Sequence, residues 1–349
     1  MSADPRRVLI LAEGFSGDPH YGKTMRGVLR YRREDVVVIL DSLRAGEVEQ
    51  GVPIVADVAA ALPFRPTAAL VGVATQGGRF PPAWREVLRE CIRQGISIEN
   101  GLHEFLTNDP DFVALAESHG VTLTDLRRAP AGLDVPTGAN LAVPGKIVLT
   151  VGSDCAIGKM TVSLELDREA RARGIASIFV PTGQTGIAIA GWGLSVDAVV
   201  ADFIAGAAER LVVEGCERGG DLLLVEGQGS ISHPAYSGVT LGLIHGSAPH
   251  AFVLCHQVGT TEVDGYPGYP LLSLPELVEL HERVSLTRRR AAVACIALNT
   301  RHVDTEAARA EIALAEAATG LVADDPVRFG PGRLLDALLA HLGLGPIRD

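Results

Sequence analysis

Several features that define whole classes of protein are scarce or absent in this sequence. Its 5 cysteines are odd in number, widely spaced and form no C-x-x-C pair, so we expect reduced thiols and neither a disulfide framework nor a zinc site. No apolar run reaches the roughly 18 residues of a membrane span, and the apolar strand near the N-terminus is too short for the core of a signal peptide. These absences predict a cytoplasmic protein that binds no metal and no membrane.

The charge balance argues against a protein that binds nucleic acids. The formal net charge is −11, and Lys and Arg form no stripe or arm that could neutralise the phosphates of a nucleic acid. Apolar residues make up 47% of the chain and charged residues 21%, an ordinary globular profile, while aromatic residues are few at 5%. We therefore expect a small-molecule substrate and no nucleic acid; we also expect a homo-oligomer.

Length and pattern predict two α/β domains. A chain of 349 residues suits about two domains, and the Pro- and Gly-rich stretch at 129–145 separates two series of alternating strands and helices. Such alternation implies parallel sheets with right-handed crossovers. We predict a Rossmann-like domain over residues 1–140 and a P-loop NTPase-like, parallel-sheet domain over 141–349. The expected strands are 7–12, 36–40, 68–73, 96–98, 146–151, 176–181, 221–226, 251–255 and 292–298; the expected helices are 24–31, 83–94, 159–173, 197–214, 274–285, 304–319 and 333–342.

Two segments resemble phosphate loops. The first, Gly17–Thr24, fits the pattern G-x-x-x-x-G-K-[ST] literally. Several residues separate it from the preceding strand, however, and Pro19 lacks the N–H that a phosphate cradle needs. We interpret this segment as a surface turn before a helix.

The second segment, Gly152–Thr161, has one residue too many between its glycines but a better context. The strand at 146–151 runs directly into Gly152, and Lys159 opens an amphipathic helix. Small residues let the backbone curl so that its N–H groups and the helix N-terminus form an anion site, to which Lys159 adds a positive charge. We therefore predict phosphate binding here. The predicted cofactor-binding residues of this loop are Gly152, Ser153, Asp154, Cys155, Ala156, Ile157, Gly158, Lys159, Met160 and Thr161.

The residue after the loop lysine bears on the reaction. In conventional P-loop NTPases it is Ser or Thr, whose hydroxyl binds Mg²⁺, but here it is Met160, which cannot. Thr161 follows one residue later, rotated by about 100° around the helix. We expect the loop to hold phosphates without cleaving them, which favours a phosphate-bearing carrier such as coenzyme A. Cys155 lies where thiols are often activated, although we favour a loop-lining role for it.

Polar residues also follow other strands of the second domain, at the sheet edge where ligands bind. Glu226 ends an apolar strand that resembles a Walker B strand and is a candidate base or cation ligand, and His233 could move protons. Asp197 and Asp202 are candidate helix caps or acceptors of a substrate ammonium group. The predicted catalytic residues are Lys159, Glu226, His233 and Asp202; the predicted substrate-binding residues are Thr182, Gln184, Thr185, Asp197, Gln228 and Arg127; Asn299 is expected to contact a nucleotide base.

Several motifs together resemble one known family. They are GSDCAIGKMT, PTGQTGIAIAGWG, DAVVADFIAGAAE, VEGQGSISHPAY and ALNT in the second half, with YGKTMRGVLRY, DSLRAG, GGRFPPAWRE and IENGLHEFL in the first. The set is similar to the family formerly defined only as a domain of unknown function, whose characterised activity is D-glutamate N-acetyltransferase. The loop alone is less specific, because dethiobiotin synthetase has a similar long loop, G-T-D-x-x-x-G-K-T, and a similar V-E-G strand end.

The resemblance implies a Rossmann-like domain joined to a P-loop domain, and transfer of an acetyl group from acetyl-CoA to the amine of D-glutamate. On this sequence, Gly152–Thr161 would hold the pyrophosphate or the 3′-phosphate of CoA. A base such as Glu226, His233 or an Asp must take a proton from the amine, and N–H groups or Lys159 could stabilise the oxyanion. The candidates for cationic clamps on the dicarboxylate are Lys23, Arg26, Arg127 and Arg128.

Three alternatives are kept open. An ATP-dependent ligase of the dethiobiotin-synthetase type would use ATP and Mg²⁺, and Met160 argues against it. A non-catalytic nucleotide-binding protein would bind without turnover, whereas the many polar strand ends favour catalysis. A dehydrogenase would use the first domain, but no G-x-G-x-x-G follows its first strand.

Overall fold

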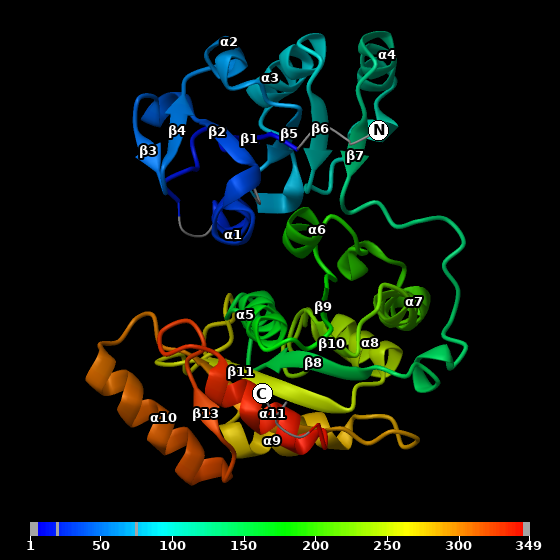
Figure 1. Ribbon diagram of the computed structural model, residues 1–349, viewed down its shortest axis with the longest axis vertical. Helices are drawn as coiled ribbons and strands as arrows, with labels where there is room; N and C mark the ends of the chain where they lie inside the picture. Colours follow the sequence, from blue (N-terminus) through cyan, green and yellow to red (C-terminus); the bar gives the residue numbers. More distant parts are fainter. Residues whose placement is uncertain (1–5, 19–20, 74–75, 345–349) are drawn as a thin grey trace. The chain divides into compact units, whose positions relative to one another are not determined.

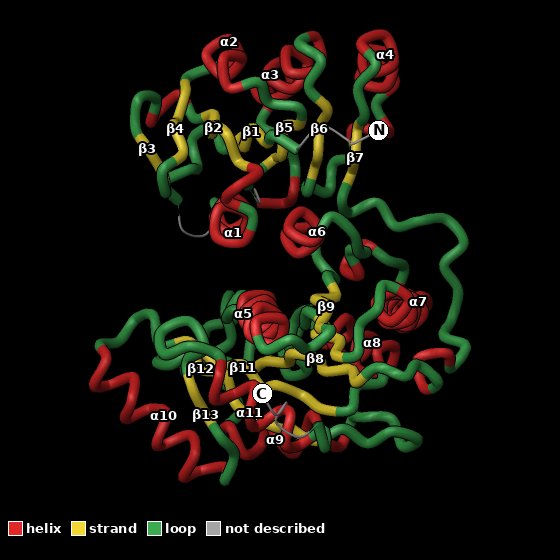
Figure 2. Tube along the Cα trace, viewed as in Figure 1, coloured by secondary structure: helices red, strands yellow, loops and turns green. Residues whose placement is uncertain are grey.

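The structure is a computed structural model that describes residues 6–18, 21–73 and 76–344. The chain forms two compact units, drawn as ribbons in Figure 1 and coloured by secondary structure in Figure 2. The first unit comprises the chain up to Arg128 together with Ile187–Trp192, and the second comprises Ala129–Gly186 and the chain from Gly193 onward. The chain therefore passes from one unit to the other at three places.

The first unit is built on a 7-stranded sheet of order β3-β4-β2-β1-β5-β6-β7. Among the described residues, only β3 and β4 pair antiparallel. Without the edge strand β3, the order is the 3-2-1-4-5-6 of the Rossmann fold, which confirms the predicted fold of this unit. Its strands are β1 (Val8–Leu11), β2 (Val36–Leu40), β3 (Val48–Glu49), β4 (Val52–Val55), β5 (Ala68–Val71), β6 (Ser97–Asn100) and β7 (Leu123–Asp125); its helices are α1 (Lys23–Tyr31), α2 (Val58–Ala61), α3 (Pro82–Arg93) and α4 (Pro110–His119).

Some elements of this unit have weak sequence signals. Strand β4 is only four residues long and contains Pro53, which is depleted in strands because it cannot donate to a ladder. Helix α4 was not predicted from the sequence either, although capping residues stand at both of its ends in the structure. The Asp109 side chain accepts the N–H groups of Asp111 and Phe112 at its start, and Gly120 closes it in the left-handed conformation, with φ of 65°.

The loop after β1 is folded around an acidic side chain. The buried carboxylate of Asp41 accepts the N–H groups of Gly14 at 3.0 Å and of Ser16 at 3.1 Å, and also the Ser16 hydroxyl. A carboxylate at the centre of this loop disfavours a phosphate there. In the segment Gly17–Thr24, Lys23 is the exposed first residue of α1, while Pro19 and His20 lie outside the described residues.

The second unit is built on a 6-stranded sheet of order β13-β12-β11-β8-β10-β9, and the paired strands that the structure describes are all parallel. From β8 the chain builds β9 and β10 on one side, then crosses to build β11, β12 and β13 on the other. The carboxyl end of β8 is therefore the switch point at which such sheets bind ligands. The strands are β8 (Lys146–Gly152), β9 (Ser177–Val180), β10 (Leu222–Val225), β11 (Ala251–Gln257), β12 (Ala292–Asn299) and β13 (Ala323–Asp324); the helices are α5 (Lys159–Ala172), α6 (Gln184–Ala190, shared with the first unit), α7 (Ile204–Glu217), α8 (Ser237–Ser247), α9 (Leu274–Arg283), α10 (Thr305–Thr319) and α11 (Gly332–His341).

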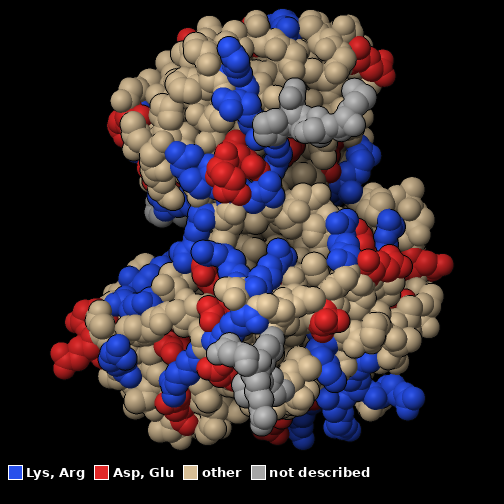
Figure 3. All heavy atoms as spheres, in the orientation of Figure 1, with Lys and Arg blue, Asp and Glu red and all other residues tan. Residues whose placement is uncertain are grey.

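Helices α5 and α11 cover the same face of this sheet. Leu166 of α5 and Leu335 of α11 are fully buried in one apolar cluster with Leu224 of β10 and Val253 of β11. This packing fixes α5, and with it the loop that precedes α5, against the centre of the sheet. On the outer surface, Lys and Arg side chains lie beside Asp and Glu on the visible face of each unit (Figure 3).

One predicted helix start was wrong. Helix α7 begins at Ile204, its N-cap is Phe203, and no side chain caps it, so neither Asp197 nor Asp202 has the capping role considered for it. Both acids instead lie in short 3-10 turns, at Val196–Ala198 and Ala201–Phe203. Helices α6 and α8 and strand β13 were not predicted. Helix α6 has only 7 residues, and α8 contains Gly238, Gly242 and Gly246, which weaken a helical signal.

Candidate active site

The loop between β8 and α5 has the backbone of an anion cradle. Gly158 adopts φ of 115° and Ala156 adopts φ of 53°, so the chain curls through left-handed conformations before α5 begins at Lys159. At its start, the Ser153 N–H donates to the Cys255 carbonyl of β11 at 3.0 Å, which anchors the loop to the sheet. The curl and the N-terminus of α5 together favour an anionic ligand.

Lys159 lies in a slot between two glycines. Its side chain is 6% exposed, and its Nζ donates to the Asp154 carbonyl at 2.6 Å. A Cβ on Gly152 would stand 3.3 Å from the Lys159 Nζ, and one on Gly227 would stand 3.1 Å from its Cδ and 1.8 Å from the Thr150 carbonyl oxygen. Position 227 therefore requires glycine, and a side chain at position 152 would push against Lys159. Burial lowers the pKa of Lys159 from its usual range.

Three side chains from neighbouring strand ends hold the loop in shape. Asn299, at the end of β12, donates from Nδ2 to the Ile157 carbonyl at 3.0 Å. His256, in β11, shares a hydrogen bond between its Nδ1 and the Ser153 Oγ at 2.9 Å, and burial lowers its pKa. The Ser230 hydroxyl donates to the Ser153 carbonyl at 3.1 Å. The Asn299 amide, expected to contact a base, thus supports the loop backbone here.

Glu226 is a buried carboxylate beside Lys159. It is 4% exposed, and its Oε2 accepts the N–H groups of Thr182 at 2.9 Å and of Gly183 at 3.1 Å. Burial, with a smaller contribution from the charge of Asp197, raises its pKa to about 7 against the opposing effects of these two N–H groups and of the Lys159 charge. A carboxyl group with this pKa can exchange a proton near neutral pH.

The P-T-G-Q-T-G segment after β9 is shaped to receive this carboxylate. A Cβ on Gly186 would lie 2.4 Å from the Glu226 Oε2, and one on Gly183 would lie 2.4 Å from the Gln228 Nε2. The Thr182 hydroxyl donates to the Glu226 carbonyl at 2.7 Å, and the Gln228 Nε2 donates to the Glu226 Oε1 at 3.3 Å. The structure thus brings the predicted residues Thr182, Gln228 and Glu226 together. Of the other two predicted residues in this segment, Thr185 is buried and Gln184 is half-buried at the start of α6.

His233 is oriented as a hydrogen-bond donor. It is 3% exposed, and its Nδ1 accepts the Ala235 N–H at 3.1 Å, so the neutral ring carries its proton on Nε2. The Nε2 lies 4.0 Å from the Asp154 Oδ1, and the ring packs against Tyr236 and Tyr266, at centroid distances of 4.7 Å and 5.2 Å. The predicted role in moving protons therefore has weaker support than a role in donating a hydrogen bond toward the loop.

Asp154, Cys155 and His233 form a group with metal-binding donor atoms. One such atom from each residue lies within 4.8 Å of the others. The donor atoms of Asp154 and His233 are poorly suited to a metal, however. The Asp154 carboxylate accepts the N–H groups of Cys155 at 2.7 Å and of Asp264 at 2.8 Å, and a proton on the His233 Nε2 leaves no lone pair there for a metal. The geometry favours a hydrogen-bonded cluster that joins the phosphate loop to the segment around Asp264.

Several other predicted residues have structural contacts of their own. The Arg127 Nε donates to the Gly101 carbonyl at 2.7 Å inside the first unit, and the Arg128 guanidinium binds Asn108 and lies over the Phe105 ring. In the second unit, Asp197 is exposed and accepts the Ser195 hydroxyl at 2.7 Å, and Asp202 is exposed. Met160 and Thr161 are half-buried in the first turn of α5, and Arg26 donates weakly to the Gly17 carbonyl, at 3.4 Å.

The sequence analysis assigned no role to some residues whose hydrogen bonds hold the candidate site together. Thr150 accepts the Gly227 N–H at 2.9 Å and shares a hydrogen bond with Ser163, which ties β8, β10 and α5 together behind Lys159. Ser230 and Asp264 contact the loop through the hydrogen bonds described above. The sequence could have indicated a role for Thr150, because it is a polar residue within an apolar strand and buried hydroxyl groups generally form hydrogen bonds.

Comparisons with known proteins agree with this architecture. A family model described as the DUF1611 P-loop domain, of unknown function, matches residues 134–335, and the model of the DUF1611 Rossmann-like domain matches residues 42–129. The fold and the loop thus define a two-domain P-loop protein, as the resemblance of the motifs implied. The chain belongs to the DUF1611 family.

Two relatives resemble about three quarters of the chain, and one solved structure resembles nearly all of it. A D-glutamate N-acetyltransferase of Tritonibacter scottomollicae is 42% identical over 275 residues, covering 78% of this chain and 80% of that protein. A D-glutamate N-acetyltransferase of a Pseudoalteromonas species is 38% identical over 274 residues, with the same coverage. The crystal structure of a DUF1611 family protein from Anabaena variabilis matches with a TM-score of 0.90 at 42% identity, covering 96% of this chain and 99% of that one.

In the part of the chain that the structure describes, none of the helices has the length and apolar character needed to cross a bilayer.

Proposed function

We propose that this protein is an N-acetyltransferase that moves the acetyl group of acetyl-CoA to the amino group of D-glutamate. The observation that carries the proposal is the position of Glu226, a buried carboxyl group with a pKa raised to about 7, beside Lys159 and the phosphate loop. The two relatives at 42% and 38% identity, both named D-glutamate N-acetyltransferase, support the choice of reaction and acceptor.

In this proposal the loop Gly152–Thr161 binds phosphate groups of the CoA moiety. Its left-handed backbone at Ala156 and Gly158, the N-terminus of α5 and the Lys159 side chain all favour an anion. Met160 occupies the position at which P-loop NTPases bind Mg²⁺ through a hydroxyl. A loop without that hydroxyl suits a carrier whose phosphates serve as a handle and are not cleaved.

Acetyl transfer then needs a base and a group that stabilises the oxyanion. The ionised Glu226 carboxylate accepts a proton from the ammonium group of the acceptor, and the neutral amine attacks the thioester carbonyl carbon. Lys159 or backbone N–H groups of the loop stabilise the oxyanion that forms. Its collapse breaks the C–S bond, the nitrogen of the new amide gives up its remaining extra proton, and the departing CoA thiolate takes up that proton. Glu226 then releases the proton that it accepted to solvent.

The five cysteines support the cytoplasm as the compartment. No disulfide bond joins any of the five, and Cys91, Cys255 and Cys295 are buried. Cysteines without disulfide bonds are typical of reducing compartments.

The proposal is tested by incubating the protein with acetyl-CoA and a panel of D- and L-amino acids while free thiol is measured. We expect thiol release with D-glutamate and formation of its N-acetyl derivative, confirmed by mass spectrometry. A parallel reaction with Mg-ATP measures ADP. ADP formation without thiol release from any acceptor would contradict the proposal and favour a ligase.

A further inference from the structure

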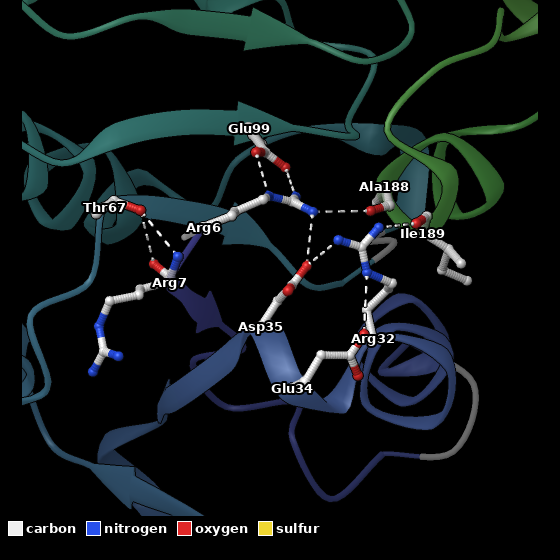
Figure 4. A network of polar contacts seen from close by, with 9 residues as sticks. All are labelled: Arg6, Arg7, Arg32, Glu34, Asp35, Thr67, Glu99, Ala188 and Ile189. Atoms are coloured by element: carbon white, nitrogen blue, oxygen red, sulfur yellow. Dashed lines mark hydrogen bonds and ion pairs between the residues drawn. The ribbon is translucent and has the colours of Figure 1, made fainter. Parts of the chain in front are cut away.

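Two arginines of the first unit hold the last turn of helix α6. Residues 187–192 belong to that unit, and there Arg32 donates from Nη1 to the Ile189 carbonyl at 2.9 Å, while Arg6 donates from Nη1 to the Ala188 carbonyl at 3.4 Å (Figure 4). Carbonyl groups in the last turn of a helix have no partner within it and carry the negative end of its dipole. Guanidinium groups are therefore well suited to bind them.

Acidic side chains fix both guanidinium groups in place. Asp35 lies between the two arginines, 3.7 Å from the Arg6 Nη1 and hydrogen-bonded to the Arg32 Nη2, and Glu99 binds Arg6 through both carboxylate oxygens (Figure 4). Because each arginine is held by acids from its own unit, the donors that face α6 have a defined direction. This arrangement differs from a solvated surface arginine, whose side chain is free to reorient.

The other end of the same helix meets the Glu226 carboxylate. The N–H groups of Thr182 and Gly183, immediately before α6, donate to the Glu226 Oε2, and Gly186 within α6 has no room for a Cβ beside that oxygen. Helix α6 is continuous over Gln184–Ala190. A hydrogen-bonded helix transmits a displacement of its last turn to its first, since its length is set at about 1.5 Å per residue.

We propose that Arg32, assisted by Arg6, is a positioning residue for Glu226 and acts through helix α6. The role in catalysis rests on the proposed function, in which Glu226 is the base. Without Arg32 the last turn of α6 is released, and the two amides at Thr182 and Gly183 no longer hold the carboxylate. Those N–H groups favour the charged carboxylate, so their loss raises the pKa of Glu226 further.

The first test compares pH profiles of acetyl transfer for two matched variants. In Arg32→Ala, we expect the acidic limb to move up by roughly one pH unit, which is a several-fold loss of rate at pH 7. Arg33→Ala is the control, because Arg33 binds the backbone carbonyls of Gln50 and Gly51 in the same unit and makes no such contact with α6. Arg33→Ala should leave the limb in place, and Arg32→Lys should recover part of the shift. Identical acidic limbs in Arg32→Ala and wild type would overturn the proposal.

The second test needs no substrate. Hydrogen–deuterium exchange of the free, full-length protein is followed in peptides covering residues 181–192. We expect faster exchange there in Arg32→Ala but not in Arg33→Ala, whose effect should appear near residues 48–55. The wild type could transfer no acetyl group while exchange at residues 181–192 is faster in Arg32→Ala and unchanged in Arg33→Ala. In that case the proposed function fails and the positioning role stands. Unchanged exchange at 181–192 in Arg32→Ala overturns the positioning role, whatever the activity.

Discussion

The two sheets place an acidic side chain at corresponding strand ends, with different consequences. In the first unit, Asp41 follows β2 and accepts the N–H groups of Gly14, Ser16 and Leu43 as well as the Ser16 hydroxyl. In the second unit, Glu226 follows β10; its Oε2 accepts two N–H groups, and its Oε1 accepts only a long bond of 3.3 Å from Gln228. The first acid is satisfied by its own loop. The second retains acceptor capacity that a substrate proton can use.

In the proposed function, this difference separates a structural acid, Asp41, from the acid that we propose as the base, Glu226. Position at a strand end and burial are common to both, whereas the number of backbone donors, three for Asp41 and two for Glu226, is not. A dehydrogenase that used Asp41 to bind a ribose would need free oxygens on that carboxylate, and the loop occupies them. We therefore place the chemistry in the second unit, and the following changes can break or sharpen that assignment.

The largest effect is expected for Lys159→Met. The substitution fills the slot between Gly152 and Gly227 without the charge, and removal of an oxyanion-stabilising donor typically lowers kcat by about 10²- to 10³-fold. Steady-state thiol release measures it. Lys146→Met, at the opposite end of β8, is the control and should keep wild-type rates. Wild-type activity in Lys159→Met would remove the loop from the mechanism.

Glu226→Gln should lower the rate by about 10²-fold, the usual contribution of a general base. The pH dependence is more specific. Because the carboxylate is active only when ionised, wild-type activity should rise with pH through about 7 and be lost below it. Glu209→Gln is the control, since Glu209 is also buried and accepts N–H groups of Thr137 and Gly138. An acidic limb near pH 7 that persists in Glu226→Gln would assign the titration to another group.

Gly227→Ala should destabilise the second unit. Its Cβ would stand 1.8 Å from the Thr150 carbonyl oxygen, so β8 and β10 must separate, at a cost of about 1–3 kcal/mol or more for overpacking. Urea unfolding measures the loss. Gly238→Ala in α8 is the matched variant, because nothing lies within 4 Å of its Cβ position, and it should be neutral or stabilising. Equal stabilities of the two variants would show that this close approach is relieved elsewhere.

The smallest effect on activity is expected for Asp41→Asn. The amide that replaces the carboxylate has fewer acceptor sites for the buried N–H and hydroxyl groups of Ser16. The free energy of unfolding should therefore fall by about 1–3 kcal/mol. The rate of acetyl transfer per folded molecule should not change, as measured by activity normalised to the folded fraction. A reduced rate in fully folded Asp41→Asn would show that the loop around Asp41 takes part in the reaction.

Most of the fold could be predicted because its signals are local. Apolar, β-branched runs that end in Gly or an acid identified the central strands, including β1, β8 and β10. Strand β13 has two residues and carries no periodicity. Helix α6 depends on contacts with Arg6 and Arg32, more than 150 residues away in the chain, which no local pattern contains.

The sequence could group the residues of the candidate site, but it could not predict their contacts. The strand–loop–helix pattern around Gly152 and Lys159 located the loop. That the Thr182 and Gly183 amides meet Glu226 follows from the pairing of β9 with β10, which sequence alone left open. The orientation of His233 depends on one hydrogen bond from the Ala235 N–H, and residue type could not reveal it.

The chain passes between the two units at three places, and this has a practical consequence for experiments that divide the protein into fragments. A fragment that stops at Arg128 lacks the six residues, 187–192, that complete the Rossmann-like unit. The complementary fragment carries Ile187, Ala188 and Ile189, which are buried in the intact chain, without their cover. Halves produced separately should therefore be poorly soluble, whereas co-expression of the two pieces should allow them to reassemble through that short segment.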